Sequence, residues 1–262
     1  MFSIKIADTV IGIQNKYEYI KHMCRDYITD EPASFSVSAN DEEIMREDTG
    51  DVSFPAEYLE TLAIYRKISD ALSEYDAFLM HGVLMEAEGR GILLCAESGT
   101  GKSTHAMLWL SLLGERCRII NGDKPLIRII DGVPYAYGTP WCGKEEINEN
   151  SRVRLSDICF LRRNEENSAT PSPKSEVVAK LLPSVHLPRN GGLSSVLEAV
   201  DTMAQNVRFW DIACNMDISA AKTILKQWEE ILNKIPYIGD NGHWYIYNVE
   251  EKRYEDSGVS AA

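Results

Sequence analysis

The residues with the clearest chemistry are Ala96-Glu97-Ser98-Gly99-Thr100-Gly101-Lys102-Ser103, followed directly by Thr104. They have the form G-x-x-x-x-G-K-[ST] of a phosphate-binding loop, with alanine at the first glycine position. In such a loop the glycines allow successive backbone N–H groups to turn toward an anion. Lys102 is expected to reach the β- and γ-phosphates of a nucleotide, and the Ser103 hydroxyl is expected to bind Mg²⁺. This stretch, the phosphate loop below, predicts binding of ATP with Mg²⁺.

Ala96 departs from the usual pattern, and it suits its position only if its φ angle is negative. The alternative to a phosphate loop is a glycine-rich turn that contains Lys-Ser by chance. The apolar run before it, residues 91–95, and the helical pattern from Lys102 favour the phosphate loop. A strand that leads into a helix N-terminus brings N–H groups and the helix dipole to the phosphates.

Asp123 is the candidate for metal and acid–base chemistry. It follows the apolar residues Ile119 and Ile120, one expected helix and one expected strand after Lys102. At the end of a strand beside the phosphate loop, its carboxylate would reach Mg²⁺ or the hydroxyl of an acceptor. The alternative is an ordinary turn aspartate, because Asn-Gly-Asp also favours turns.

A second candidate site is the loop of residues 137–146, YGTPWCGKEE. Glycine and proline around a Trp and a Lys suit a rigid loop that contacts substrate. Lys144 would stabilise the charge of the transferred phosphoryl group, and Trp141 would pack on a base or a peptide. The alternative is a structural turn with Trp141 buried. Four nearby arginines include possible phosphate clamps, namely Arg152, Arg154, Arg162 and Arg163, but the alternation of the surrounding residues favours ordinary exposed charges for most of them.

These candidates must be positioned by alternating strands and helices. Period-2 and period-3.6 hydrophobic patterns, with turn residues between them, give the expected elements. The expected strands are residues 78–86, 91–96, 118–121, 126–130, 133–137, 158–161 and 207–213. The expected helices are residues 55–75, 102–113, 175–182, 192–205 and 217–233. Residues 1–50 contain short alternating segments, residues 164–175 read as a surface loop, and the tail from Lys234 is expected to be loose.

Composition limits the class of protein. The 262 residues carry 40 acidic and 27 basic side chains, a formal net charge of -13, which disfavours nucleic acid or an anionic membrane as the main partner. No apolar run is long enough for a membrane helix, and the N-terminus lacks the pattern of a signal peptide. The six cysteines are scattered without metal-binding spacing, as expected for a protein of the reducing cytoplasm.

The order of these motifs resembles the HPr kinase/phosphorylase-like family of the phosphoenolpyruvate carboxykinase superfamily. The resemblance spans roughly residues 76–215, and it is most specific from His81-Gly82-Val83-Leu84 through the phosphate loop to Asp123. It implies an α/β fold with a mixed β core around the phosphate loop, ATP with Mg²⁺, and a place for His81 beside the γ-phosphate. The family usually has two aspartates where this chain has Gly122 and Asp123. Without the resemblance, His81 also fits a strand histidine with ordinary partners.

The sequence therefore predicts three parts: a small α+β region over residues 1–75, a nucleotide-binding kinase-like domain over 76–233, and a tail over 234–262. The expected activity is transfer of the γ-phosphoryl group to a hydroxyl of a peptide, protein or small molecule, with Lys102, Asp123 and His81 as catalytic residues. The alternative is a non-catalytic ATP sensor or peptide-binding accessory module, which the missing second acid would favour. The sequence leaves open whether the chain forms a homo-oligomer.

Overall fold

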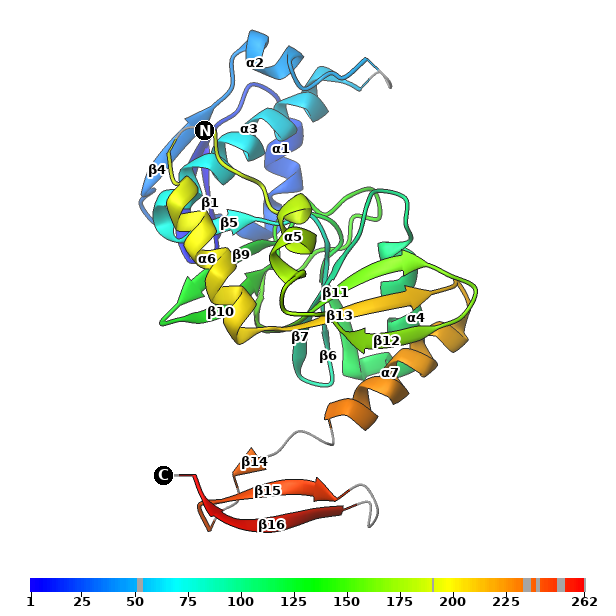
Figure 1. Cartoon of the computed structure of the whole chain (residues 1–262). Helices are drawn as coiled ribbons and strands as arrows, with labels where there is room; N and C mark the ends of the chain where they lie inside the picture. The colour runs from blue at the N-terminus through cyan, green and yellow to red at the C-terminus, as the bar shows by residue number, and fades with distance from the viewer. Residues whose placement is uncertain (51–53, 190, 233–236, 239–240, 249–252, 262) are drawn as a thin grey trace.

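The computed structural model describes residues 1–262 except 51–53, 190, 233–236, 239–240, 249–252 and 262. The described residues form a mixed α/β structure with three sheets, the largest of which has nine strands (Figure 1). No helix among these residues is long and apolar enough to cross a membrane.

The N-terminal residues form a four-stranded sheet with three helices. Its strands, in the order β3-β1-β2-β4, are β1 (Phe2–Ile6), β2 (Thr9–Gln14), β3 (Ile28–Thr29) and β4 (Phe35–Ser38). The helices are α1 (Glu18–Met23), α2 (Asp41–Met45) and α3 (Ala56–Leu72). Because apolar and polar residues alternate in β1 and β4, the sequence predicted both strands, and the prediction is confirmed. The side chains of α3 share a core with this sheet and with Tyr137 and Trp141 of the neighbouring part of the chain.

The nine-stranded sheet has the order β5-β9-β10-β11-β7-β6-β8, and β13 pairs with β11 and β12. Its strands are β5 (Ala77–Leu79), β6 (Val83–Ala87), β7 (Arg90–Cys95), β8 (Cys117–Asn121), β9 (Leu126–Ile130), β10 (Val133–Tyr137), β11 (Arg152–Arg163), β12 (Ser168–Pro171) and β13 (Arg208–Cys214). The expected strands 126–130 and 133–137 are confirmed to the residue. The expected strand 158–161 is the middle of the longer β11, which pairs with β10 at its start and with β7 and β13 further along.

Four strands of this sheet end at the same edge. Strands β7, β11 and β13 run parallel, and β6 runs antiparallel to both β7 and β8. The carboxyl ends of β7, β8, β11 and β13 therefore lie together. In open α/β sheets, ligands bind in the crevice outside such ends.

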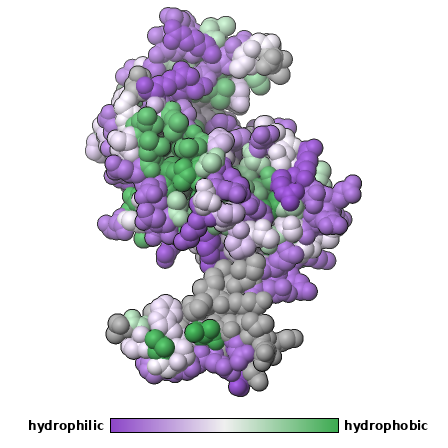
Figure 2. Space-filling model, in the orientation of Figure 1, coloured by the Kyte–Doolittle hydropathy of each residue, from purple (hydrophilic) through white to green (hydrophobic). Residues whose placement is uncertain are grey.

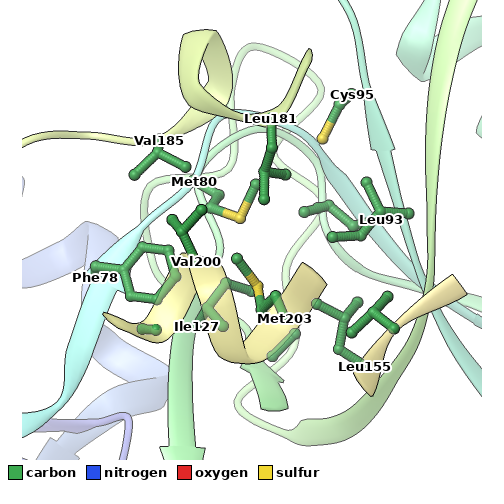
Figure 3. Close-up of a cluster of buried hydrophobic side chains, with 14 of the residues drawn as sticks. Phe78, Met80, Leu93, Cys95, Ile127, Leu155, Leu181, Val185, Val200 and Met203 are labelled. Carbon is green, nitrogen blue, oxygen red and sulfur yellow. The ribbon is translucent and has the colours of Figure 1, made fainter. Parts of the chain in front are cut away.

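Helices cover both faces of the sheet, and alternation along β7 shows how. Ile92 and Leu94 pack under α4 (Lys102–Leu113) and α7 (Ile218–Leu232). Leu93 and Cys95 point to the opposite face, toward α5 (Val177–Leu181) and α6 (Leu193–Asn206), as Figure 3 shows. A strand with both faces buried reads as a continuous apolar run, which is the pattern of residues 91–95.

Three expectations from the sequence are wrong in detail. The expected strand 78–86 is two strands, because residues 80–82 leave the pairing with β9 before β6 pairs with β7. The expected loop 164–175 contains β12, which pairs with β13.

The expected loose tail is the third. Its described residues form β14 (Tyr237–Ile238), β15 (His243–Asn248) and β16 (Arg253–Ser260), joined as one sheet. The other tail residues, 234–236, 239–240, 249–252 and 262, lie outside the described part of the chain.

Candidate functional site

The phosphate loop joins the end of β7 to the first turn of α4. Gly99 and Gly101 have φ angles of +78° and +116°, in the left-handed region that only glycine adopts readily. A Cβ at either position would meet no atom within 4 Å, so backbone conformation rather than space requires glycine there. Ala96 has a negative φ and therefore meets the condition for alanine at the first position.

Lys102 is the first residue of α4, and its side chain folds back over the loop. Its Nζ atom donates to the Ala96 carbonyl at 2.9 Å and to the Glu97 carbonyl at 3.4 Å, and the residue is 8% exposed. Burial lowers the pKa of Lys102, and the negative charge of Asp123 opposes this shift. The ammonium group is thus enclosed by the loop and lies within electrostatic reach of Asp123.

Ser103 and Thr104 follow in the first turn of α4, and both are half-buried. Among the described residues, no group of three or more His, Cys, Asp or Glu side chains could hold a metal ion. The Ser103 hydroxyl and the Asp123 carboxylate are oxygen donors of the kind that Mg²⁺ prefers. Mg²⁺ in nucleotide sites takes one or two protein ligands and completes its shell with phosphate and water, so these two residues fit a phosphate-borne ion.

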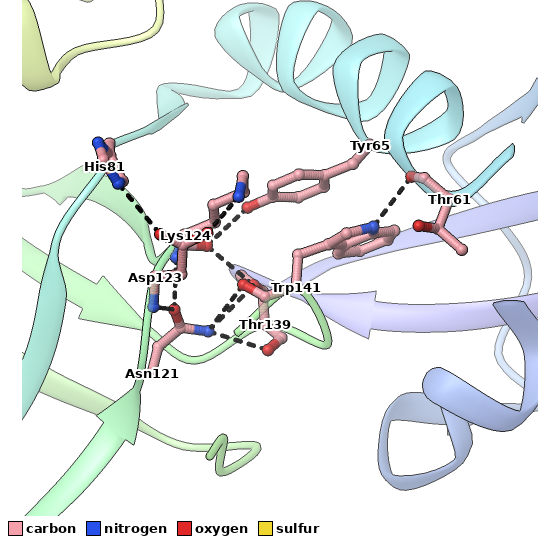
Figure 4. A network of polar contacts seen from close by, with 8 residues as sticks. All are labelled: Thr61, Tyr65, His81, Asn121, Asp123, Lys124, Thr139 and Trp141. Carbon is pink, nitrogen blue, oxygen red and sulfur yellow. Dashed lines mark hydrogen bonds and ion pairs between the residues drawn. The ribbon is translucent and has the colours of Figure 1, made fainter. Parts of the chain in front are cut away.

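Asp123 lies just beyond β8 and contacts two cationic or polar side chains. Its Oδ1 atom is 3.1 Å from His81 Nε2, and its Oδ2 atom accepts from Lys124 Nζ (Figure 4). Burial raises the pKa of Asp123, but the His81 hydrogen bond and the Lys124 charge outweigh it and lower the pKa to about 2. Asp123 is therefore a carboxylate at any physiological pH.

The turn that carries Asp123 is held by Asn121. The Asn121 Oδ1 atom accepts from the backbone N–H groups of Asp123 (3.0 Å) and Lys124 (2.7 Å). Its Nδ2 group donates to the backbone carbonyl of Thr139 at 2.9 Å, and its side chain is fully buried. Figure 4 shows this network between the strand end and the loop after β10. The tripeptide Asn121-Gly122-Asp123 predicts only a turn, although an asparagine at the end of an apolar strand is a signal for such side-chain-to-backbone bonding.

Gly122 has no room for a side chain. A Cβ there would lie 2.5 Å from the Cys142 carbonyl oxygen, which belongs to the backbone and cannot move aside easily. The φ angle of Gly122 is negative, so space alone makes this position a glycine. Position 122 therefore cannot carry the second carboxylate that the resemblance led us to look for.

The loop 137–146 separates its two candidate residues. Trp141 is 4% exposed, stacks on Tyr65 with ring centroids 4.0 Å apart, and donates from Nε1 to the Thr61 carbonyl at 2.9 Å. This placement matches the structural alternative for Trp141, because an enclosed ring has no free face for a base or peptide. Lys144 is exposed and makes no ion pair among the described residues.

Arg163 is one of the four arginines that the sequence allowed as phosphate clamps, and it contacts the phosphate loop. At the end of β11, next to β7, its Nε atom donates to the Thr100 carbonyl at 3.0 Å and its Nη2 atom donates to the Gly99 carbonyl. No local feature of the sequence distinguishes Arg163 from its neighbour Arg162. Only the pairing of β11 with β7 brings this arginine to the phosphate loop.

Comparisons with known proteins give a distant likeness. No protein-family model and no curated protein matches the chain. Among solved structures, the HPr(Ser) kinase/phosphatase from Coxiella burnetii is similar with a TM-score of 0.35 and 8% identity. The match covers 59% of this chain and 97% of that chain.

Proposed function

We propose that this protein is an ATP- and Mg²⁺-dependent phosphotransferase that moves the γ-phosphoryl group to a hydroxyl of a peptide, protein or small molecule. The observation that carries the proposal is the meeting of Lys102, Asp123 and His81 at the edge where β7 and β8 end. A cation enclosed by a phosphate loop and an ionised carboxylate beside it are the two groups that phosphoryl transfer needs most. The formal net charge of -13 disfavours nucleic acid or an anionic membrane as the acceptor.

The loop and Lys102 would bind and orient the nucleotide. Backbone N–H groups of residues 97–102 and the N-terminus of α4 would hold the β-phosphate, while Lys102 would leave the carbonyls of Ala96 and Glu97 for phosphate oxygens. Ser103 and Asp123 would provide the protein ligands of Mg²⁺, which when bound neutralises charge on the phosphates.

Asp123 would orient the acceptor hydroxyl and take its proton late. A carboxylate with a pKa near 2 is a weak base, but phosphoryl transfer passes through a loose transition state in which little proton transfer is required. His81 would act as a positioning residue, because its Nε2–H fixes the direction of the Asp123 carboxylate.

A second candidate function is a non-catalytic ATP sensor or peptide-binding accessory module. Two observations favour it: Gly122 excludes a second carboxylate, and Lys124 already pairs with the remaining one. A site with one paired acid would bind metal weakly and still hold nucleotide through the loop.

The substitution Asp123→Asn distinguishes the two functions, because it keeps the shape of the side chain and removes its charge. For the kinase we expect ATP affinity within roughly tenfold of the parent and transfer or background hydrolysis reduced by about a hundredfold or more. Asp131→Asn is the matched control, since Asp131 lies in the exposed turn between β9 and β10 and should change neither quantity.

The measurements are ATP affinity by calorimetry with and without Mg²⁺, and release or transfer of labelled γ-phosphate over hours with lysate fractions as acceptors. If the parent releases and transfers nothing, and Asp123→Asn changes only Mg²⁺-dependent affinity, the kinase assignment is replaced by the sensor.

A further inference from the structure

A groove lies beside the phosphate loop, where β11 and β13 end. It has a volume of about 700 Å³ and is lined by residues of the two turns that follow these strands, among them Arg163, Glu165, Asn215 and Met216. Ligand sites for small molecules typically have volumes of about 300–1,000 Å³. The groove is therefore large enough for a nucleoside, and it opens at the sheet edge that carries the phosphate loop.

The order of the strands places this groove on the side of β7 opposite Asp123 and His81. Asp123 and His81 lie on the β6–β8 side of β7, so the γ-phosphate of a bound nucleotide would point that way. The rest of the nucleotide must then extend toward the other side, where β11 and β13 follow. With strands about 4.8 Å apart, β13 lies about 10 Å from β7, a separation that an α-phosphate and a ribose can span.

Arg163 contacts both the groove and the phosphate loop. Its backbone is at the end of β11, in the wall of the groove, and its guanidinium contacts the carbonyls of Gly99 and Thr100 in the phosphate loop. An exposed guanidinium at this junction is suited to a phosphate oxygen, because it offers several donors in a fixed plane.

The walls of the groove are preformed by two asparagines. Asn164 donates from Nδ2 to the Glu166 carbonyl at 2.9 Å, and its N–H donates to the Cys214 carbonyl at 3.0 Å. Asn215 donates from Nδ2 to the Glu165 carbonyl at 3.2 Å, so each turn is bonded to the other. These amides are used in shaping the groove, which leaves the carboxylates and Met216 as its contact groups.

Met216 gives the groove an apolar surface. It is 61% exposed, and it follows Asn215 directly in the turn after β13. A thioether side chain packs well against aromatic rings. The carboxylates of Glu165 and Glu166 are exposed and accept hydrogen bonds, as ribose hydroxyls and exocyclic amino groups require.

We propose that this groove binds the nucleoside of a purine nucleotide, with Arg163 beside the α-phosphate and Met216 against the base. The inference rests on the proposed function, because it assigns the groove to the nucleotide whose phosphates lie on the loop. It identifies the residues that would distinguish a nucleotide from a bare polyphosphate.

The test compares two probes, ATP and inorganic tripolyphosphate, each titrated with Mg²⁺ into the full chain by calorimetry. Met216→Ser should weaken ATP binding roughly 3- to 10-fold, the effect of losing one apolar contact, and leave tripolyphosphate binding within about twofold. Met45→Ser is the matched control, since Met45 is 58% exposed on α2 and should leave both probes unchanged. In a second measurement, the fluorescence of Met216→Trp should change with ATP and not with tripolyphosphate, while that of Met45→Trp should respond to ATP only as the parent does.

The outcomes separate the two proposals. If the parent binds neither probe, the proposed function fails and the groove assignment falls with it. If the parent binds both probes, Met216→Ser alters neither and Met216→Trp responds no more than the parent, the groove assignment is overturned and the proposed function stands.

Discussion

The Nε2 atom of His81 lies 3.1 Å from Oδ1 of Asp123, and the backbone ties the same two segments together, since the Gly82 N–H donates to the Asp123 carbonyl at 2.9 Å. His81 precedes β6 and Asp123 follows β8, and these two strands are antiparallel neighbours. The contacts therefore hold the segment before β6 against the segment after β8. The same segment is held from the other side, where the His81 N–H donates to the Ser184 carbonyl at 2.7 Å. The carboxylate of Asp123 is therefore held in place by hydrogen bonds to the segment around His81.

Replacing His81 tests whether its hydrogen bond positions the carboxylate of Asp123. His81→Leu removes the hydrogen bond that helps to hold the pKa of Asp123 at about 2, so the acid limb of the pH–rate profile should move to higher pH. The shift is toward higher pH because the pKa of Asp123 rises when the donor is lost. In the parent, the depressed pKa of Asp123 also stabilises the folded protein above the unfolded pKa, and this stability is lost as the pH falls toward 2. His81→Gln retains a donor and should keep the parent profile. Equal profiles for His81→Leu and the parent would rule out this positioning role.

Lys102→Ala should abolish detectable nucleotide binding, because the loop loses its only enclosed cation among the described residues while the glycine turns remain. We expect an affinity loss of about a hundredfold or more, the scale of a charge-assisted contact to phosphate in a buried site. The measurement is calorimetry on a variant shown to be folded by circular dichroism. Lys226→Ala, at an exposed position on α7, is the control, and unchanged ATP affinity in Lys102→Ala would contradict the phosphate-loop assignment.

Gly122 should not tolerate a second carboxylate. Gly122→Ala places a Cβ against the Cys142 carbonyl, so we expect a loss of roughly 1–3 kcal/mol in the free energy of unfolding. Gly122→Asp should lose at least as much and should not strengthen Mg²⁺-dependent ATP binding. Denaturant unfolding and calorimetry measure the two quantities. A stable Gly122→Asp protein with tighter Mg²⁺-dependent binding would show that the turn can open.

Lys124 should compete with Mg²⁺ for Asp123. Its ammonium pairs with the carboxylate, so Lys124→Ala should lower the Mg²⁺ concentration that gives half-maximal ATP binding by several-fold. Lys124→Arg retains the charge and serves as the control. An increase of the half-maximal Mg²⁺ concentration in Lys124→Ala would mean instead that Lys124 contacts the phosphates.

His105 should make the protein sensitive to mild acid. It is 2% exposed on α4, its Nε2 accepts from Trp109 Nε1 at 3.0 Å, and its Nδ1 has no partner among the described residues. Burial lowers its pKa to about 4. In the unfolded chain His105 is protonated below about pH 6.5, whereas in the folded protein it stays neutral until about pH 4. The free energy of unfolding therefore decreases as the pH falls from 6.5 toward 4.

Urea unfolding measures this effect. Between pH 7 and pH 5 the contribution of His105 should decrease by about 2 kcal/mol. In His105→Gln, which keeps an acceptor for Trp109, the decrease should be smaller than in the parent by about this amount. The same decrease in both proteins would show that other groups cause it.

Figure 2 shows an apolar patch over α6 and the segment before it. Exposed apolar side chains of α6 and of the segment before it include Leu187, Leu193 and Leu197. The patch lies on helices that cover the sheet face opposite α4, and the Ser184 carbonyl that supports His81 comes from the same segment.

Local features of this protein could be predicted from the sequence. The glycine turn of residues 96–103, the strands 126–130 and 133–137 and the helix that ends before Gly114 depend on patterns within a few residues. These patterns are the hydrophobic period, the glycine positions and turn chemistry. The negative φ required of Ala96 follows from the same local logic, because backbone sterics act between neighbours. The place of Asp123 after an apolar strand also follows from the sequence, and its role at the site stays a prediction.

Only the tertiary structure determines which distant residues these local features contact. The insertion of β6 between β7 and β8, the contact of His81 with Asp123 and the reach of Arg163 to the phosphate loop all depend on strands far apart in the chain. The burial of Trp141 depends on α3, and the lack of space at Gly122 depends on the Cys142 carbonyl. Pairing of distant strands is selected by the packing of whole faces of the sheet, whereas local patterns specify only which residues lie on each face.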